Sequence, residues 1–324
     1  MTRQQLLARL AYFTNPANGI GAVLYFILLE GGEPVIRLAD IEDDAKNELK
    51  DRFLETINDL FINNPDLQYR NISEADQRKD VVYYYDLDEP LTRLDILGEV
   101  LANEEQPFFQ FQGHNLQQVQ GYLITIGNEA NRIALYKKHY PVNLLKRDRF
   151  LLVPAGQRLV SVTQDAIALD RNFEFMMVDD NLIVLKLTVL ERFFGFDEVI
   201  RNQAEETITA IGAHDILQDI AQLTELSQDM GAARKLMKLR NSPVLNIPVD
   251  RIIHFIQGHT ALAGKIQFNE AGDRIKLDTI QARKLFLKVL NDDYLFSQLS
   301  ELSYDTHAKD ALTPGGNGAD GPEE

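Results

Sequence analysis

The pattern of apolar residues changes near residue 188, and this change constrains the fold more than any other feature. Before it, short apolar segments alternate with turn signals. AVLYFILLE precedes EGGEP, and NFEFMMV and LIVLKL are joined by a tight Asp179-Asp180-Asn181 turn. Adjacent, turn-linked segments of this kind are typical of antiparallel strands. After it, segments such as TVLERFFGFDEVIRNQAEETITAI follow helical spacing. The sequence therefore predicts an α+β protein with an N-terminal mixed, mostly antiparallel sheet with helices, followed by a helical C-terminal domain.

This pattern divides the chain into three expected parts. Residues 1–188 form the mixed α+β domain, with helices over about 3–12 and 42–62. Residues 189–311 form the mainly helical domain, which contains a small hairpin at 265–277 and then a helix pair that ends near Tyr304. The low-complexity tail TPGGNGADGPEE places a disordered segment at 312–324.

The composition and the apolar runs favour a cytoplasmic protein without direct membrane insertion. The chain has no cysteine, which excludes disulfides and thiolate zinc sites and suits a reducing compartment. The most apolar run, GIGAVLYFILL, is shorter than the roughly 20 residues that a membrane-spanning helix needs. The start of the chain also lacks the pattern of a signal peptide. Any link to a membrane is therefore expected to come through a partner.

No catalytic residue, metal ligand or cofactor can be assigned from the sequence. His254 and His259 are five residues apart, whereas two zinc ligands on one helical face are four apart, and His254 is expected to be a partly buried structural residue. A restriction-type nuclease would place an acid two residues before Lys186, where this chain has Val184. We therefore expect that the protein is not an enzyme. A metal-dependent nuclease and a hydrolase whose residues meet only in space stay open as alternatives.

The sequence segment 132–149 is basic in a protein that is acidic as a whole. It contains six basic residues and one acid, while the whole chain has a net charge of −16. A second basic group, at 234–240, follows helical spacing, with Leu236 and Leu239 on the opposite face. Basic loops next to aromatic residues, here Tyr136, His139, Tyr140 and Phe150, suit contacts with the phosphates and bases of nucleic acid. The simpler interpretation is a solvated face that pairs with nearby acids.

These two groups supply the residues that we predict to bind the DNA backbone. The lysine and arginine side chains of these groups can bind phosphate without recognising bases. The predicted contact is therefore with the DNA backbone and has little sequence preference. The predicted DNA-binding residues are Lys137, Lys138, Lys146, Arg147, Arg149, Arg234, Lys235 and Lys238.

Several segments, in the right order, resemble the KwaB component of the Kiwa anti-phage defence system. They are YYYDLDEP, then ITIGNEANRIALYKKHYP, then ALDRNFEFMMVDDNLIVLKLTVLERFFGFDEVI, and finally LKVLNDDYLFSQLSELSYDTHAK. The resemblance covers roughly residues 80–310 and is weakest in the first 80. It contains no short catalytic signature, so no family site residue can be transferred to this chain.

The resemblance implies a cytoplasmic DNA-binding effector that works with a membrane partner, KwaA, and hinders phage replication. It also implies recruitment to the inner face of the cell membrane through that partner. The apolar cluster Leu190, Phe193, Phe194 and Phe196 adds the expectation of a homodimer or higher homo-oligomer, unless these side chains pack under the sheet. An adaptor that binds only protein partners is a further alternative.

Overall fold

The computed structural model describes residues 1–75, 81–102, 105–112, 114–140, 144–145, 152–156, 158–161, 166–297 and 302–306. The predicted residues Lys146, Arg147, Arg149 and Phe150 and the predicted tail at 312–324 lie outside these ranges. Within the described ranges, no helix combines the length and apolar character that are needed to cross a membrane.

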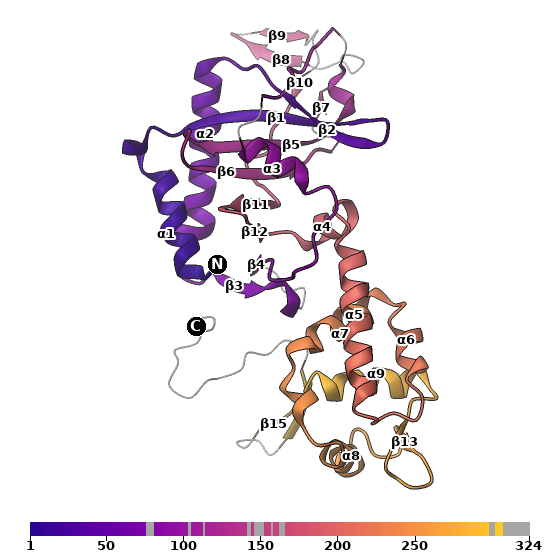
Figure 1. Ribbon diagram of the computed structural model, residues 1–324. Coiled ribbons are helices and arrows are strands. Elements are labelled where there is room, and N and C mark those ends of the chain that lie inside the picture. Colours follow the sequence, from indigo (N-terminus) through magenta and orange to yellow (C-terminus); the bar gives the residue numbers. More distant parts are fainter. Residues whose placement is uncertain are drawn as a thin grey trace.

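The chain up to residue 184 supplies most of the strands, and the chain after it supplies most of the helices (Figure 1). The elements up to residue 184 are α1 (Arg3–Thr14), β1 (Gly21–Glu30), β2 (Glu33–Leu38), α2 (Asp43–Ile57), a π-helical turn (Asn58–Ile62), β3 (Gln68–Asn71), β4 (Val81–Tyr84), α3 (Asp95–Leu101), β5 (Val119–Gly127), β6 (Arg132–Lys138), β7 (Leu144–Leu145), β8 (Leu152–Ala155), β9 (Arg158–Ser161), β10 (Ala166–Ile167), β11 (Phe175–Val178) and β12 (Asn181–Val184). The elements after it are α4 (Leu187–Phe193), α5 (Phe196–Ala213), α6 (Ala221–Leu226), α7 (Met230–Lys238), α8 (Val249–Gly258), β13 (Gln267–Phe268), β14 (Ile275–Lys276), α9 (Ile280–Leu290), β15 (Tyr294–Ser297) and β16 (Leu302–Asp305).

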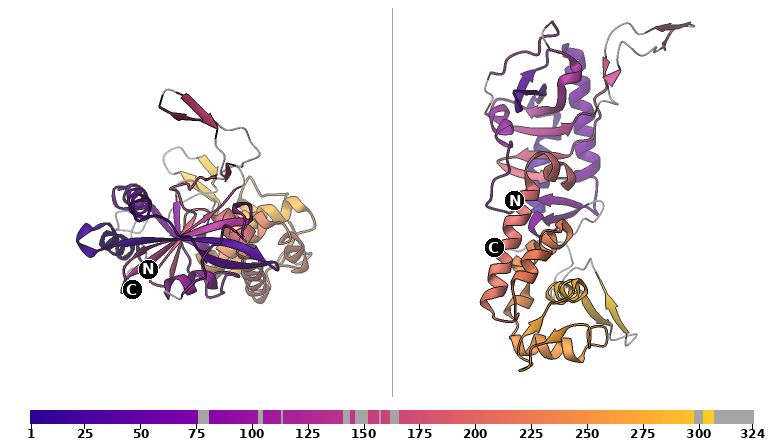
Figure 2. Two further views of the ribbon diagram at one scale, coloured as in Figure 1. Left: turned by 90° about the horizontal axis from the view of Figure 1, so that it is seen from above. Right: turned by 90° about the vertical axis from the view of Figure 1, so that its right-hand side faces the viewer.

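Eight strands form one mixed sheet in the order β2-β1-β5-β6-β11-β12-β4-β3. Of its seven neighbouring pairs only β3 and β4 run parallel, so the predicted mixed, mostly antiparallel sheet is confirmed. Viewed from above, the strands fan out around a common axis, as expected for a strongly twisted sheet (Figure 2). The α+β fold class is therefore correct.

Two tight turns explain why neighbouring strands pair as the sequence predicts. Gly31 and Gly32 connect β1 to β2, and both have positive φ, at 63° and 94°. Asp179 and Asp180 connect β11 to β12 with φ of 46° and 62°. A two-residue hairpin turn with positive φ at both central positions matches the natural twist of the strands, which is why glycine and aspartate occur there.

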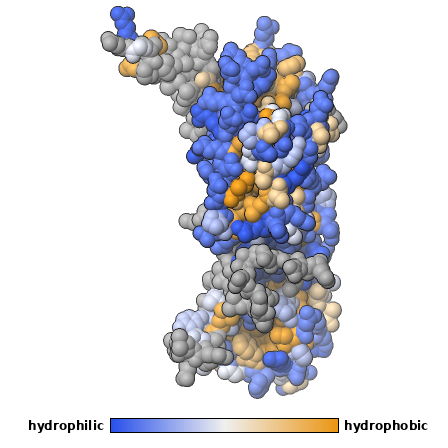
Figure 3. Space-filling view, turned by 90° about the vertical axis from the view of Figure 1, so that its left-hand side faces the viewer, coloured by the Kyte–Doolittle hydropathy of each residue, from blue (hydrophilic) through white to orange (hydrophobic). Residues whose placement is uncertain are grey.

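The sheet has a different hydrophobic cluster on each face. On one face, α1 and α2 cover residues such as Leu24 and Phe26 of β1. On the other, alternate residues such as Tyr25 and Ile27 join a cluster that includes α3, α4 and α5 and continues to α9. Figure 1 shows α1 and α2 side by side along the sheet, and α5 entering the helical half. The face that carries α1 and α2 is mainly hydrophilic on the outside, with separate apolar patches (Figure 3).

Two detailed predictions for the helical half are wrong. The expected helix pair near Tyr304 is one helix, α9, followed by a hairpin in which Leu295 pairs with Tyr304. Asp292 takes φ of 55°, a left-handed conformation that ends a helix, and the residues after it favour strands. His254 is exposed instead of partly buried, because α8 buries its isoleucine face and His254 lies outside that face.

Candidate nucleic-acid interface

Lys137 and Lys138 lie at the end of β6 but point to opposite faces of the sheet. Ile133 and Leu135 pack on the α1–α2 side, whereas Ala134 and Tyr136 pack on the α4–α5 side. Because side chains alternate along a strand, Lys137 follows the first pair and Lys138 follows the second. The two predicted phosphate contacts are therefore not adjacent on one surface.

The Lys138 ammonium lies over an aromatic ring on α4. Its Nζ atom is 4.6 Å from the ring centroid of Phe193, and it donates a hydrogen bond to Oε1 of Gln120 at 3.3 Å. Burial lowers the pKa of Lys138 from its ordinary value, and the nearby Glu174 carboxylate opposes this shift. Lys138 is thus held by a cation–π contact and by a neutral hydrogen bond.

Glu174 is a buried carboxylate between three lysines. It is 1% exposed, and its Oε2 accepts the backbone N–H of Lys138 at 2.7 Å. Its Oε1 lies 3.7 Å from Nζ of Lys137 and 3.8 Å from Nζ of Lys186. Lys137 also pairs with Asp170 at 3.4 Å. The positive charge of Lys137 is therefore balanced by two acids.

The predicted basic helix is α7, and two of its cations are also paired with acids. Nη2 of Arg234 lies 2.7 Å from Oε2 of Glu191, and its Nε donates to Oε1 at 3.1 Å. Nζ of Lys235 lies 3.7 Å from the buried Asp293. Lys238 is half-buried and has no acidic partner among the described residues. As predicted, Leu236 and Leu239 are buried on the other side.

The short helix α4 contacts one described residue from each basic segment. Lys138 lies over Phe193, and Arg234 pairs with Glu191. Arg192, on the same helix, is exposed. We name Lys138, Arg192 and Arg234 the α4 basic group. Arg192 is not among the predicted DNA-binding residues because it is a single cation within an apolar run. Its position between Glu191 and Phe193 becomes informative only through the tertiary contacts of those two residues.

Of the described aromatic residues beside β6, two are buried and one is exposed, so they do not form an exposed stacking surface together. Tyr136 is buried and stacks on Phe175 with ring centroids 4.5 Å apart and nearly parallel rings. His139 is also buried, and within the described residues neither of its ring nitrogens has a hydrogen-bond partner. Burial is the main reason that the pKa of His139 falls below its usual value, and Lys138 adds to the effect. Tyr140, by contrast, is exposed.

The apolar residues that suggested self-association pack inside the chain. Leu190, Phe194 and Phe196 are buried in the cluster shared with the sheet, and Phe193 is half-buried beneath Lys138. The alternative that they pack under the sheet is therefore correct. The expectation of an oligomer has no support from these four side chains.

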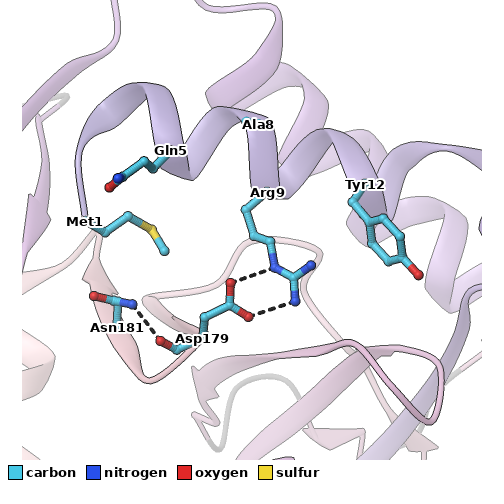
Figure 4. A pocket seen from close by; sticks show the side chains of 7 residues that line it. All are labelled: Met1, Gln5, Ala8, Arg9, Tyr12, Asp179 and Asn181. Atoms are coloured by element: carbon cyan, nitrogen blue, oxygen red, sulfur yellow. Dashed lines mark hydrogen bonds and ion pairs between the residues drawn. The ribbon is translucent and has the colours of Figure 1, made fainter.

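An open hollow lies on the other side of the molecule, between α1 and the β11–β12 turn. Figure 4 shows the side chains that line it: Met1, Gln5, Ala8, Arg9, Tyr12, Asp179 and Asn181. The Arg9 guanidinium pairs with Asp179, whose carboxylate Oδ2 lies 2.6 Å from Nε. This pair holds the left-handed turn of the hairpin against α1. Across the described residues, no group of three or more His, Asp and Glu side chains is arranged to hold a metal ion.

Comparison with known proteins identifies the family of the chain. The family described as Kiwa protein KwaB-like matches residues 116–300. The chain belongs to the KwaB-like family. One relative, Kiwa protein KwaB of Escherichia coli O55:H7 (strain RM12579 / EPEC), is 29% identical over 318 residues, which cover 96% of this chain and 99% of that protein. This relationship confirms the resemblance seen in the sequence and supports a role in Kiwa anti-phage defence. No solved structure matches the chain.

Proposed function

We propose that this KwaB-like protein acts in Kiwa anti-phage defence by binding the phosphate backbone of DNA with little sequence preference. The observation that carries the proposal is the meeting of the two basic segments at α4, where Lys138 and Arg234 contact the same helix. Cations that gather around one short helix can bind phosphates even in a protein with a net charge of −16, because acids elsewhere on the surface repel DNA from other paths.

The chemistry of the α4 basic group suits phosphate better than bases. Arginine presents a planar fork of N–H donors that fits phosphate oxygens, and exposed lysine acts as a point charge. Of the described aromatic side chains that are placed beside these cations, Tyr136 is buried and Phe193 lies beneath Lys138, so neither is free to stack on bases. The proposed contact therefore depends on charge and does not distinguish sequences.

The test is a titration of the purified full chain with labelled duplexes of unrelated sequence, followed by fluorescence anisotropy. We expect similar affinities for the different sequences and a steep loss of affinity between about 50 mM and 200 mM salt, with a slope of about −0.9 for each neutralised phosphate. Reversing Lys146 and Arg147 to Glu should weaken binding and flatten this slope, although both residues lie outside the described ranges.

Two results would replace this proposal with one of the alternatives. Absence of DNA binding at the lowest salt concentration would favour an adaptor that binds only protein partners. Degradation of DNA that is stopped by EDTA and by a single Asp or Glu substitution would establish a metal-dependent nuclease.

We propose further that the protein assembles with a KwaA-like membrane protein, at the inner face of the cell membrane, as a homodimer or higher homo-oligomer. Membership of the KwaB-like family supports the presence of a partner protein. Exposed apolar side chains that are available for protein contacts include Phe108, Phe111, Leu159, Phe255 and Ile280. Co-purification with the partner and light scattering of the isolated chain are the measurements. A chain that stays monomeric at micromolar concentration would contradict the oligomer.

A further inference from the structure

Of the five described cations that are predicted to bind DNA, three are paired with acids of the same chain. Lys137 lies beside Glu174 and Asp170, Arg234 beside Glu191, and Lys235 beside Asp293. An arginine that already pairs with a carboxylate has fewer N–H groups to offer a phosphate. DNA binding by this face must therefore compete with interactions inside the protein.

The pair between Arg234 and Glu191 is the strongest of these competitors. Two separate donor–acceptor contacts join the guanidinium to the carboxylate, at 2.7 Å and 3.1 Å. The side chains are only 19% and 14% exposed, so water screens their attraction less than at an open surface. By contrast, Lys235 and Asp293 are 3.7 Å apart, which is an ion pair without a hydrogen-bond distance.

The donors that hold Glu191 are those that would hold a phosphate. Arginine binds carboxylates and phosphates through the same fork of N–H donors. One side of the guanidinium therefore cannot hold a carboxylate and a phosphate at the same time. We propose that Glu191 competes with DNA phosphate for Arg234, so that full DNA binding at α4 requires the Arg234–Glu191 pair to open. This inference rests on the proposed function and adds a residue that sets the strength of binding.

Opening this pair also loosens a link between two parts of the fold. Glu191 lies on α4, which directly follows β12 of the sheet, and Arg234 lies on α7, which packs against α5 in the helical half. DNA that binds Arg234 favours the state in which the pair is open, and any partner that separates α4 from α7 favours the same state. DNA and such a partner therefore strengthen each other's binding.

The experiment compares wild-type protein with Glu191→Gln and Glu191→Asp in the anisotropy titration. Glu191→Gln removes the competing charge, so we expect about threefold to tenfold tighter binding at low salt and a slope that steepens by about 0.9, as for one added phosphate contact. Glu191→Asp keeps the charge but withdraws the carboxylate by one methylene group, so we expect a smaller gain in the same direction. This second variant decides the matter if Glu191→Gln does not fold.

A matched control separates this effect from the change in net charge. Glu225→Gln makes the same change in charge at α6, where Glu225 pairs with Arg283 at 2.7 Å. We expect it to leave DNA affinity at the wild-type value. In an Arg234→Gln background, Glu191→Gln should lose its effect, because the cation that it would release is absent.

Three outcomes contradict the inference, and they can be distinguished from failure of the proposed function. Wild-type protein that binds DNA, with neither Glu191 variant binding more tightly, overturns the inference alone. Equal tightening by Glu191→Gln and Glu225→Gln, or a full gain in the Arg234→Gln background, also overturns it alone. No salt-dependent DNA binding by the wild-type protein or by any variant overturns the proposed function and the inference together.

Discussion

The backbone N–H of Lys138 donates a hydrogen bond of 2.7 Å to the carboxylate of Glu174, a residue that is only 1% exposed. The same carboxylate balances Lys137 on the opposite face of the sheet. One buried acid therefore supports the end of β6, from which the basic segment continues toward residue 149. Glu174 fixes the end of β6 through this hydrogen bond. The lysines balance its negative charge, since burying an unpaired carboxylate would cost free energy.

Glu174→Ala should destabilise the fold by about 2–4 kcal/mol, because it removes the acceptor for Lys138 and leaves Lys137 near the interior with one acid fewer. Glu174→Gln should cost less, since its amide oxygen can still accept the Lys138 N–H. Urea unfolding followed by circular dichroism measures both changes. The control is Glu55→Ala, which breaks an exposed pair with Arg171 and should cost less than about 1 kcal/mol. Equal effects at the two positions would contradict the role given to Glu174.

Acidification should destabilise the protein through His139. Burial lowers the pKa of His139 below 6.5 in the folded state, so between that lowered pKa and 6.5 the unfolded chain binds more protons than the folded chain. Stability from this residue is therefore complete above pH 6.5 and is lost as the pH falls through this window. Thermal unfolding at a series of pH values should show this loss for the wild-type protein and a smaller loss for His139→Phe. An identical pH dependence in the two proteins would show that His139 does not titrate as described.

The elements that local patterns specify were predictable, and those that depend on distant contacts were not. The β1–β2 and β11–β12 hairpins follow from turn residues next to apolar segments, and both are confirmed. The parallel pairing of β3 with β4 has no such local signal, because the pairing residues are not joined by a tight turn. The pairing of β15 with β16 was mistaken for a helix, because Asp292 could not be assigned a left-handed conformation from the sequence.

The candidate interface was also predictable only where local sequence patterns determine it. Clustering of positive charge was visible in the sequence, but the acids that balance it were not, because Glu174 lies well beyond Lys137 in the chain and Glu191 well before Arg234. Alternation along β6 places Lys137 and Lys138 on opposite faces, which follows once residues 132–138 are known to form a strand. The meeting of both segments at α4 required the tertiary structure.

The turn between β11 and β12 offers a stabilising substitution. Asp180 has φ of 62°, a conformation that glycine adopts without the steric penalty of a Cβ atom. Asp180→Gly should therefore stabilise the protein by about 0.5 kcal/mol, whereas Asp180→Val should destabilise it by about 1–2 kcal/mol. Thermal unfolding of the two variants checks the difference. If valine were tolerated as well as glycine, the turn would not have the left-handed backbone described here.

Arg192 gives the sharpest test of where DNA lies on this protein. Its side chain is exposed on α4, beside the residues that contact Lys138 and Arg234, and it has no acidic partner among the described residues. If α4 faces DNA, Arg192→Glu removes one phosphate contact and adds a repulsive charge. DNA affinity at low salt should then fall by about threefold to tenfold, and the salt slope should become shallower by about 0.9.

The control for this test is Lys46→Glu, which makes the same charge reversal on α2, the helix that covers the opposite face of the sheet. Lys46 is paired with Asp43 at the surface, so its reversal should leave the fold intact. We expect DNA affinity of Lys46→Glu to stay within about twofold of the wild-type value, because exposed charges further apart than a Debye length are largely screened. Equal weakening by both reversals would mean that DNA responds only to overall charge. An unchanged affinity in folded Arg192→Glu would show that α4 lies outside the interface, and the basic residues around it would then serve only to balance the acids that they contact.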